Sequence, residues 1–410
     1  MDLNESPEHR AYRARIRAWF EQHRPGRLDT LAERRAWHRQ LYDAGFVGMG
    51  WPKAYGGHEA SPIEQAIVGE EMASANVPGI INTLGIGFIG PTLIAHGTEG
   101  QKQQYLKKIL TAEELWCQLY SEPDSGSDLA SLKTTAVRNG DHYVVNGQKV
   151  WSSQAKDADY AILLARTDPA APKHKGISYF ILDMHTPGIE VRPLKQITGS
   201  SEFCEEFLTD VKVPVENRIG EEGQGWVLAQ TTLGFERGGS LLARVTAHKA
   251  VLNRLIEVCK TLPRNGGIAI DDPLVRQKIG RMVAEVEVLR YAGLRLLSKL
   301  EKGERPGPES SVDKLYYSEM DKRHQEWMQE ILGPYGQIMA DPPDEVALNI
   351  VPTRDGEGSW AYNFLWSRAG TIYSGSSEIQ KNIIGERVLG LPREPRADRV
   401  SRAERVGREG

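Results

Sequence analysis

Apolar residues recur at helical spacing over most of the first 115 residues of the chain. This spacing predicts helices, because it collects the apolar side chains on one face. Four segments carry the pattern: 10–23, 31–44, 62–75 and 98–110. Pro62 suits the first turn of its helix, and Thr98 is a candidate N-cap. We therefore expect a helical N-terminal domain over residues 1–115.

The pattern changes at Leu115, where short runs of β-branched and aromatic residues begin. These runs are Val137, 143–145, 160–165, 177–182, 189–191 and 205–208. Turn-forming pairs separate them, namely Asn139-Gly140, Asn146-Gly147 and Pro187-Gly188. Short strands with regular turn signals predict an antiparallel β-barrel or sandwich, here over residues 116–223.

Long helical patterns return over residues 224–392, most clearly at 224–261 and 273–300. Within this region, 342–358 has the character of a polar insertion or lid. The tail 393–410 carries six Arg and four acidic residues and almost no apolar ones, which is typical of a disordered segment. The order helical, β, helical predicts the fold class, a multidomain α+β protein.

The composition argues against several classes of function. With 410 residues, 40% of them hydrophobic and 26% charged, the chain is long enough for two or three domains with ample cores. Its formal net charge of −4 provides no basic field for nucleic acid. No stretch approaches the roughly 18 apolar residues that a membrane span needs, so no membrane insertion is expected.

The cysteines, the N-terminus and the histidines bear on compartment and metal binding. Cys117, Cys204 and Cys259 lie far apart, which argues against a disulfide framework and fits a reducing compartment. Residues 1–17 are charged and lack the apolar core of a secretory signal, so we expect a cytoplasmic protein. The ten histidines form no HxH or HExxH pattern, and no metal site is expected.

Residues 85–90, Gly-Ile-Gly-Phe-Ile-Gly, match the dinucleotide-binding pattern G-x-G-x-x-G. That interpretation needs a strand before the motif and a βαβ unit around it. A helical segment precedes it instead, and Pro91 starts the next helix at once. We therefore interpret the glycines as sites of close helix packing.

The segment 119–131 is the most informative part of the chain. Its sequence, Leu-Tyr-Ser-Glu-Pro-Asp-Ser-Gly-Ser-Asp-Leu-Ala-Ser, follows an apolar strand-like run. Hydroxyls and unpaired backbone N–H groups at the end of a strand can hold a planar polar heterocycle or phosphate oxygens. The alternative is a solvated turn, the usual fate of a Ser/Gly/Asp cluster.

Several motifs in order resemble those of the acyl-CoA dehydrogenases, over about residues 30–392. They are 44–57, 118–131, 147–153, 207–225 and 373–380. The resemblance implies a helical N-terminal domain, a middle antiparallel β-barrel and a C-terminal four-helix bundle. It also implies α,β-dehydrogenation of an acyl-CoA thioester to the trans-2-enoyl-CoA, as in fatty acid β-oxidation, with electrons passed to an electron-transfer flavoprotein. The glycines of 85–90 would leave room for a bulky acyl chain.

The resemblance further implies a noncovalent FAD and assigns residues to it. The implied FAD positions are Gln118, Tyr120, Ser121, Ser127, Trp151, Ser153, Glu330, Gly333, Ser376 and Glu378. The implied acyl-CoA positions are Ser127, Phe235, Arg237, Tyr373, Ser374 and Gly375. Trp151 would cover the flavin ring; taken alone, a tryptophan is more often a core residue.

The base that removes the α-proton must be a carboxylate in a dry pocket. Many family members carry Glu at the position of Ser374, so here the usual base is missing. A minority place Glu on a helix just before an Arg, which matches Glu236-Arg237. The resemblance thus implies that Glu236 is the base and that Ser374 offers a backbone N–H to the thioester carbonyl. The alternative is a Glu236 that only forms a salt bridge.

Two departures from the family bear on assembly. The Arg-x-Thr pair that meets the FAD pyrophosphate is absent from 265–270, and Arg264 is the nearest base. Glu330 stands where the family has Gln, and a Glu near a pyrophosphate would repel it. The partner is therefore expected to be either a second copy or a paralogue, in a homotetramer or a heterotetramer. Bacterial heteromeric members that act on dicarboxylyl or steroid side-chain thioesters look most similar. A flavin oxidase or monooxygenase, and a structural subunit, are the alternatives.

Overall fold

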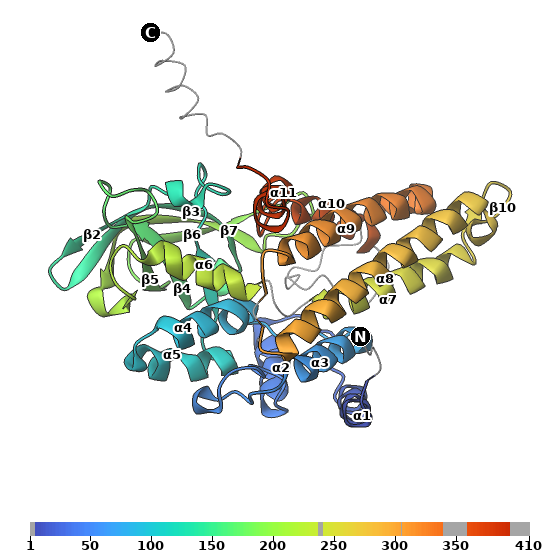
Figure 1. The fold of residues 1–410 in the computed structure, drawn as a ribbon, viewed down its shortest axis with the longest axis horizontal. Coiled ribbons are helices and arrows are strands. Elements are labelled where there is room, and N and C mark those ends of the chain that lie inside the picture. The colour runs from blue at the N-terminus through green and yellow to red at the C-terminus, as the bar shows by residue number, and fades with distance from the viewer. Residues whose placement is uncertain (1–4, 237–240, 305, 339–358, 394–410) are drawn as a thin grey trace, which may run out of the picture.

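The computed structural model describes residues 5–236, 241–304, 306–338 and 359–393. Helices, then a β-sheet, then helices follow one another along the chain (Figure 1). The order predicted from the sequence, helical, β, helical, is confirmed. No helix in these described ranges is long and apolar enough to cross a membrane. All three cysteines are free and buried.

Five α-helices form the N-terminal part: α1 (Pro7–Gln22), α2 (Leu31–Asp43), α3 (Pro62–Ala75), α4 (Gly90–His96) and α5 (Glu99–Thr111). Three of them begin with a capping box, in which the N-cap hydroxyl and the residue three positions later bond each other's backbone N–H. The N-caps are Thr30, Ser61 and Thr98, so the predicted cap at Thr98 is confirmed.

The glycine segment 85–90 is helical throughout. Gly85–Ile89 forms a π-helix, η2, that continues into α4, so the strand required for a dinucleotide-binding motif does not precede it. The predicted close packing holds at two positions. A Cβ on Gly85 would lie 2.5 Å from the Asn82 side chain, and one on Gly90 would lie 2.1 Å from the Trp51 ring. A Cβ on Gly87 would meet no atom within 4 Å.

Eight strands form the sheet of the middle part: β1 (Trp116–Leu119), β2 (Thr135–Asn139), β3 (His142–Ser153), β4 (Tyr160–Arg166), β5 (Ile177–Asp183), β6 (Ile189–Leu194), β7 (Phe203–Pro214) and β8 (Arg218–Ile219). Their order is β6-β7-β3-β2-β4-β5-β8, and β1 pairs with β4. The pairs are antiparallel as predicted, except that β1 and β2 run parallel to β4.

The turn predicted at Asn146-Gly147 is wrong. β3 runs through this pair without turning, and a β-bulge shifts its register against β7 between Val145 and Gly147. Glycine is needed there because a Cβ would lie 2.3 Å from the Thr134 hydroxyl. The Asn146-Gly147 pair therefore marks a β-bulge at which another segment comes close to the backbone, which is a common reason for glycine within a strand.

Helices dominate the C-terminal part: α6 (Gly225–Glu236), α7 (Leu241–Cys259), α8 (Pro273–Glu301), α9 (Ser310–Leu332), α10 (Ser359–Gly370) and α11 (Ser377–Ile383). A short hairpin of β9 (Pro263–Arg264) and β10 (Gly267–Ile268) joins α7 to α8. The single helix predicted over 224–261 contains both α6 and α7, and 237–240 lie outside the described residues. The predicted insertion at 342–358 and nearly all of the predicted tail also lie outside them.

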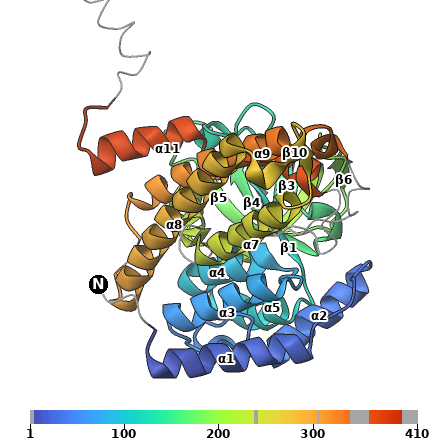
Figure 2. The same ribbon diagram turned by 90° about the vertical axis from the view of Figure 1, so that its right-hand side faces the viewer.

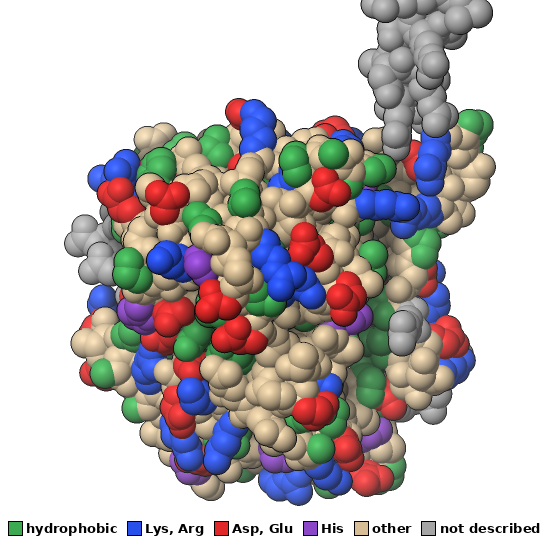
Figure 3. All heavy atoms as spheres, turned by 90° about the vertical axis from the view of Figure 1, so that its left-hand side faces the viewer, with side chains coloured by type: hydrophobic (Ala, Val, Ile, Leu, Met, Phe, Trp, Pro, Cys, Tyr) green, Lys and Arg blue, Asp and Glu red, His purple; other side chains and the backbone are tan. Residues whose placement is uncertain are grey.

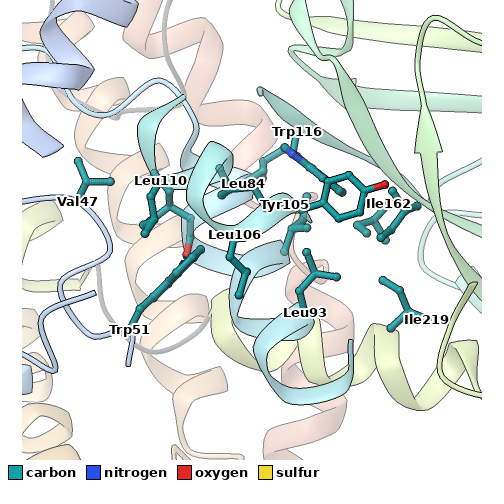
Figure 4. Packing of buried hydrophobic residues seen from close by; sticks show 14 of the residues in the cluster. Val47, Trp51, Leu84, Leu93, Tyr105, Leu106, Leu110, Trp116, Ile162 and Ile219 are labelled. Carbon is teal, nitrogen blue, oxygen red and sulfur yellow. Dashed lines mark hydrogen bonds between the residues drawn. The ribbon is translucent and has the colours of Figure 1, made fainter. Parts of the chain in front are cut away.

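The three largest of the four hydrophobic clusters among the described residues form the cores of these parts. The first joins the N-terminal helices to one face of the sheet, with Leu93, Tyr105 and Leu106 against Trp116 and Ile162 (Figure 4). The second lies on the other face of the sheet, and the third lies between α7, α8 and α9. α3 also packs against α7 and α8, which connects the two helical parts directly (Figure 2).

The surface carries mixed charge. On the face shown in Figure 3, acidic and basic side chains are interspersed rather than collected into fields of one sign. Opposite charges also pair at exposed positions of the chain, as in Arg192–Glu190 and Lys133–Asp124.

Candidate functional site

Two of the sequence motifs meet at the end of β1. The N–H of Val150 donates to the carbonyl of Ser121 at 2.9 Å, and the Nζ of Lys149 donates to the carbonyl of Tyr120 at 3.0 Å. The segment 118–121 therefore lies against β3 where β3 carries Trp151 and Ser153. The structure thus brings together five of the predicted residues: Gln118, Tyr120, Ser121, Trp151 and Ser153.

A buried ion pair stabilises this junction between segment 118–121 and β3. Lys149 is fully buried and lies 3.0 Å from the Glu122 carboxylate, which also accepts the N–H groups of Lys133 at 2.6 Å and Thr134 at 2.9 Å. Burial would raise the pKa of Glu122, but the Lys149 charge and these hydrogen bonds hold it below its usual value. Burial lowers the pKa of Lys149 to about 8, against the opposing effect of Glu122. Both groups are therefore mainly charged at neutral pH.

Trp151 offers a flat aromatic face beside these residues. Its φ of 65° is in the left-handed region, and 60% of its surface is exposed, which is unusual for a tryptophan. Ser121 and Ser153 are both partly exposed near it. A bare indole face flanked by hydroxyls and backbone N–H groups fits a planar heterocycle with polar edges, such as a flavin.

An aromatic contact joins this strand to the C-terminal helices. The ring of Phe203 on β7 lies edge-on to Trp151 at 6.2 Å and is stacked with Trp366 of α10 at 5.9 Å. α10 is thereby held at the end of the sheet, where Figure 1 shows α10 and α11 near β7. The loop between these two helices contains Tyr373, Ser374 and Gly375.

The loop after α10 has a strained and firmly held backbone. Ser374 and Gly375 both have positive φ, of 54° and 87°. A non-glycine residue in this region costs about 1–2 kcal/mol, so other contacts must impose it. Gln380 donates to the Ser374 carbonyl at 3.0 Å, and Lys314 of α9 donates to the Gly375 carbonyl at 2.8 Å. These bonds hold the Ser374–Gly375 and Gly375–Ser376 peptide groups and so fix the directions of the Gly375 and Ser376 N–H groups.

Ser376 and Glu378 lie at the start of α11. The Ser376 hydroxyl is the N-cap and accepts the N–H of Ile379 at 3.3 Å. Glu378 is in the first turn, where backbone hydrogen bonding and the Ser376 hydroxyl lower its pKa. Within one chain these two residues therefore organise the helix start.

Ser127 lies exposed at the tip of the turn that follows Glu122. The Ser125 hydroxyl donates to the Asp128 carbonyl at 2.7 Å, and Lys173 pairs with the Asp128 carboxylate at 2.7 Å. These contacts close the turn on both sides of Ser127. A hydroxyl at an exposed, well-braced tip is accessible to a phosphate or to the polar part of a cofactor.

Glu330 and Gly333 lie elsewhere, at the end of α9. Glu330 pairs with Lys278 of α8, so its charge is compensated within the chain. Its carbonyl accepts Arg264 at 3.1 Å, and Arg264 also pairs with Asp272 at 2.9 Å. This places the segment beside the β9–β10 hairpin, which Figure 1 shows at the end of the bundle remote from the sheet. One chain alone does not bring Glu330 and Gly333 to Trp151.

α6 ends at the proposed catalytic residue. Glu236 is the last residue of α6, and its neighbour Phe235 is 41% exposed. The side chain of Glu236, and Arg237 altogether, lie outside the described residues. Four residues earlier, Thr232 is buried and bonds Tyr179 of β5 at 2.7 Å and Thr92 of α4 at 2.9 Å. The end of α6 is thus anchored to both the sheet and the N-terminal helices.

Sequence reasoning missed the residues that brace the site. Lys149, Tyr179 and Thr232 were not predicted, because each lies in a segment whose overall pattern indicates only a strand or a helix. The one available signal was Lys149 itself, a charged residue within an otherwise strand-like motif. In the described part of the chain, no group of three or more His, Cys, Asp or Glu is placed to hold a metal ion.

Three domain models of one family match the chain in order. They are the N-terminal, middle and C-terminal domains of acyl-CoA dehydrogenases, matched over residues 6–113, 117–211 and 223–389. Together with the helical, β, helical order and the junction at Trp151, these matches identify the class. The chain belongs to the acyl-CoA dehydrogenase family.

Known relatives place it more closely within that family. Acyl-CoA dehydrogenase IpdE1 of Mycobacterium tuberculosis is 38% identical over 396 residues, covering 93% of this chain and 98% of the relative. The structure of the ChsE4-ChsE5 complex from Mycobacterium tuberculosis matches with a TM-score of 0.82 and 32% identity, over 96% of this chain and 100% of that one. A Tcur3481-Tcur3483 steroid ACAD matches with a TM-score of 0.82 and 30% identity, over 96% and 100%.

Proposed function

We propose that this chain binds FAD noncovalently and dehydrogenates an acyl-CoA thioester at its α,β bond, giving the trans-2-enoyl-CoA. The observation that carries the proposal is the junction of residues 118–121 with β3 at Trp151. It sets an exposed indole face among hydroxyls and backbone N–H groups, and the chain belongs to a family defined by this chemistry.

The residues at this junction divide the work of holding the cofactor. Gln118, Tyr120 and Ser121 would meet the edge of the flavin ring, and Trp151 with Ser153 would cover its other face. Ser127, at the exposed turn tip, would reach the phosphates of the FAD or the CoA. Bound there, FAD would supply the two-electron acceptor for the β-hydrogen, which leaves as a hydride.

Two positions of the chain would act on the α-hydrogen. The Ser374 backbone N–H would donate to the thioester carbonyl and so make the α-hydrogen more acidic. The contacts of Gln380 and Lys314 hold the two peptide groups that follow this N–H in the loop. Glu236, at the end of α6, would take that hydrogen as a proton. Phe235, Arg237, Tyr373 and Gly375 would line the site around the thioester.

The space near α6 supports a bulky acyl group as substrate. A Cβ on Gly87 of η2 or on Gly234 of α6 would meet no atom within 4 Å, and η2 packs against α6. The steroid ACAD among the similar structures points in the same direction. A Gly87→Leu variant should lose activity on steroid side-chain thioesters while keeping it on a short acyl-CoA such as butyryl-CoA. Equal losses on both would contradict this assignment.

The assembly proposed is a tetramer in which a neighbouring subunit completes the FAD site. Glu330 and Gly333 lie far from Trp151 within one chain, so they would serve the adenosine half of a neighbour's FAD, together with Ser376 and Glu378. Arg264 is already engaged with Asp272 and the end of α9. A paralogous subunit that supplies the missing cation is therefore the favoured partner, and a homotetramer is the alternative. The ChsE4-ChsE5 complex contains two differently named proteins and is therefore a precedent for an assembly of two different subunits.

The test is anaerobic reduction of the bound flavin by a panel of acyl-CoA thioesters, with an artificial acceptor to complete turnover. It is run on the chain alone and with its co-expressed paralogue. Bleaching by at least one thioester supports the proposal, and transfer to an electron-transfer flavoprotein would identify the natural acceptor. Rapid reoxidation by O₂ would indicate an oxidase instead. Flavin that no thioester reduces, with or without the paralogue, would contradict the proposal.

A further inference from the structure

Four buried hydroxyl groups form a continuous chain across the three parts of the molecule. The Tyr120 hydroxyl lies 2.6 Å from that of Tyr179, which lies 2.7 Å from Thr232 Oγ1, which lies 2.9 Å from Thr92 Oγ1. All four residues are buried, and Tyr179 is fully so. The chain joins the end of β1 to β5, then to α6, then to α4.

The number of hydroxyl protons limits the directions of these hydrogen bonds. Each hydroxyl donates one hydrogen bond, and Thr92 also contacts the Phe88 carbonyl at 2.7 Å. Thr232 Oγ1 also lies 3.0 Å from the Leu228 carbonyl, so its single proton goes either to that carbonyl or to Thr92, while Tyr120 and Tyr179 can each donate to the next hydroxyl along the chain. Two of the hydroxyls thus have backbone carbonyls as acceptors, Phe88 for Thr92 and Leu228 for Thr232. Hydrogen-bonded hydroxyls in such a chain strengthen one another, so the chain braces the elements that it joins.

The two ends of the chain matter for the reaction. Tyr120 is in the segment that lies against Trp151, and Thr232 is four residues, or about one helical turn, before Glu236 on the same face of α6. Hydrogen bonds are directional, so bonds to Thr232 from two other elements restrict the rotation of α6. The hydroxyls of Tyr179 on β5 and Thr92 on α4 supply these two bonds to Thr232.

We infer that Tyr179 and Thr232 are positioning residues, which set the rotation of α6 and so the placement of its last turn, which ends at Glu236. This inference rests on the function proposed above. The paired hydroxyls hold α6, which carries the proposed base, in a fixed position relative to the segment that faces the flavin. A misplacement of a catalytic group by about 1 Å can lower the rate about 100-fold.

The experiment compares Thr232→Val, Tyr179→Phe and the double variant in the FAD-loaded protein. Thr111→Val is the matched control, because Thr111 is also buried and its hydroxyl donates to the Lys107 carbonyl of its own helix at 3.1 Å. We expect the rate of anaerobic flavin reduction to fall about 10-fold to 100-fold in both single variants, with KM and FAD content little changed. The double variant should be no slower than the worse single variant, because the two hydroxyls act as a unit. Thr232→Ser should restore the rate.

A second readout does not depend on activity. Hydrogen exchange of the peptides covering 225–236 should accelerate in Thr232→Val and Tyr179→Phe and stay unchanged in Thr111→Val. Single variants that reduce flavin as fast as wild type, or a Thr111→Val control that is equally slow, would overturn the inference. A wild-type protein that no thioester reduces would overturn the proposed function, while faster exchange confined to the two variants would still show that the chain fixes α6.

Discussion

Replacing Lys149 by Met removes one partner of the buried ion pair and leaves the Glu122 carboxylate in an apolar setting. Breaking such a pair costs about 3–5 kcal/mol, because the remaining charge has no counter-ion. Glu122 keeps the N–H groups of Lys133 and Thr134, at 2.6 and 2.9 Å, so we expect the lower end, about 3 kcal/mol. Lys149→Met also removes the donor to the Tyr120 carbonyl, so the flavin-facing segment should loosen and FAD affinity should fall about tenfold.

The assay is urea unfolding followed by circular dichroism, with FAD affinity measured by fluorescence on the same samples. Lys133→Met is the control, because Lys133 forms an exposed pair with Asp124 and its loss should cost less than about 1 kcal/mol. Adding Glu122→Gln to Lys149→Met should recover part of the lost stability, since it removes the uncompensated charge. Lys149→Met protein with wild-type stability and wild-type FAD affinity would refute the role of this pair.

Three further predictions test the site from other sides. Trp151→Ala should fold normally, because Trp151 is 60% exposed and contributes little to the core, but it should lose its FAD during gel filtration. A Trp151→Ala protein that keeps its yellow FAD through the column would contradict this prediction. Burial raises the pKa of Glu206 to about 7, so its pKa is higher in the folded than in the unfolded protein, and stability is lost as pH rises from about 4.5 through 7. The free energy of unfolding of Glu206→Gln should therefore exceed that of wild type by on the order of 3 kcal/mol at pH 8 and by almost nothing at pH 4. Thermal unfolding at the two pH values measures this difference. Light scattering with absorbance at 450 nm should give one FAD per two chains in a heterotetramer or one per chain in a homotetramer, and a monomer with full FAD would exclude both.

The sequence was most informative where local chemistry decides the structure. Residues 62–75 were predicted as a helix, and α3 spans Pro62–Ala75, because proline at the first position and a capping box define its start. The hydroxyl-rich segment 119–131 and the motif that contains Trp151 could likewise be recognised in the local sequence. Each of these features depends on residues within one turn or one strand.

What the sequence did not show depends on contacts between distant segments. Asn146-Gly147 resembles a hairpin turn, yet the close approach of Thr134 makes it a bulge inside β3. Tyr179 has the pattern of a core strand residue, and its hydroxyl finds partners only through tertiary contacts, with Tyr120 59 positions before it and with Thr232 of α6 53 positions after it. Lys149 is similar, because Glu122 is brought to it by the pairing of segments that are separate in sequence. Such pairings follow from tertiary packing, which residue patterns do not encode one by one.

The most direct test of the central claim is stopped-flow reduction of the bound flavin in wild-type and Glu236→Gln protein, each mixed anaerobically with a thioester that wild type accepts. Glutamine is nearly isosteric, so FAD content and acyl-CoA binding should stay the same. Loss of a general base should slow bleaching at 450 nm by at least about 10²–10⁴-fold. Bleaching of Glu236→Gln at close to the wild-type rate would contradict the account, because the proton would then be leaving to a different group.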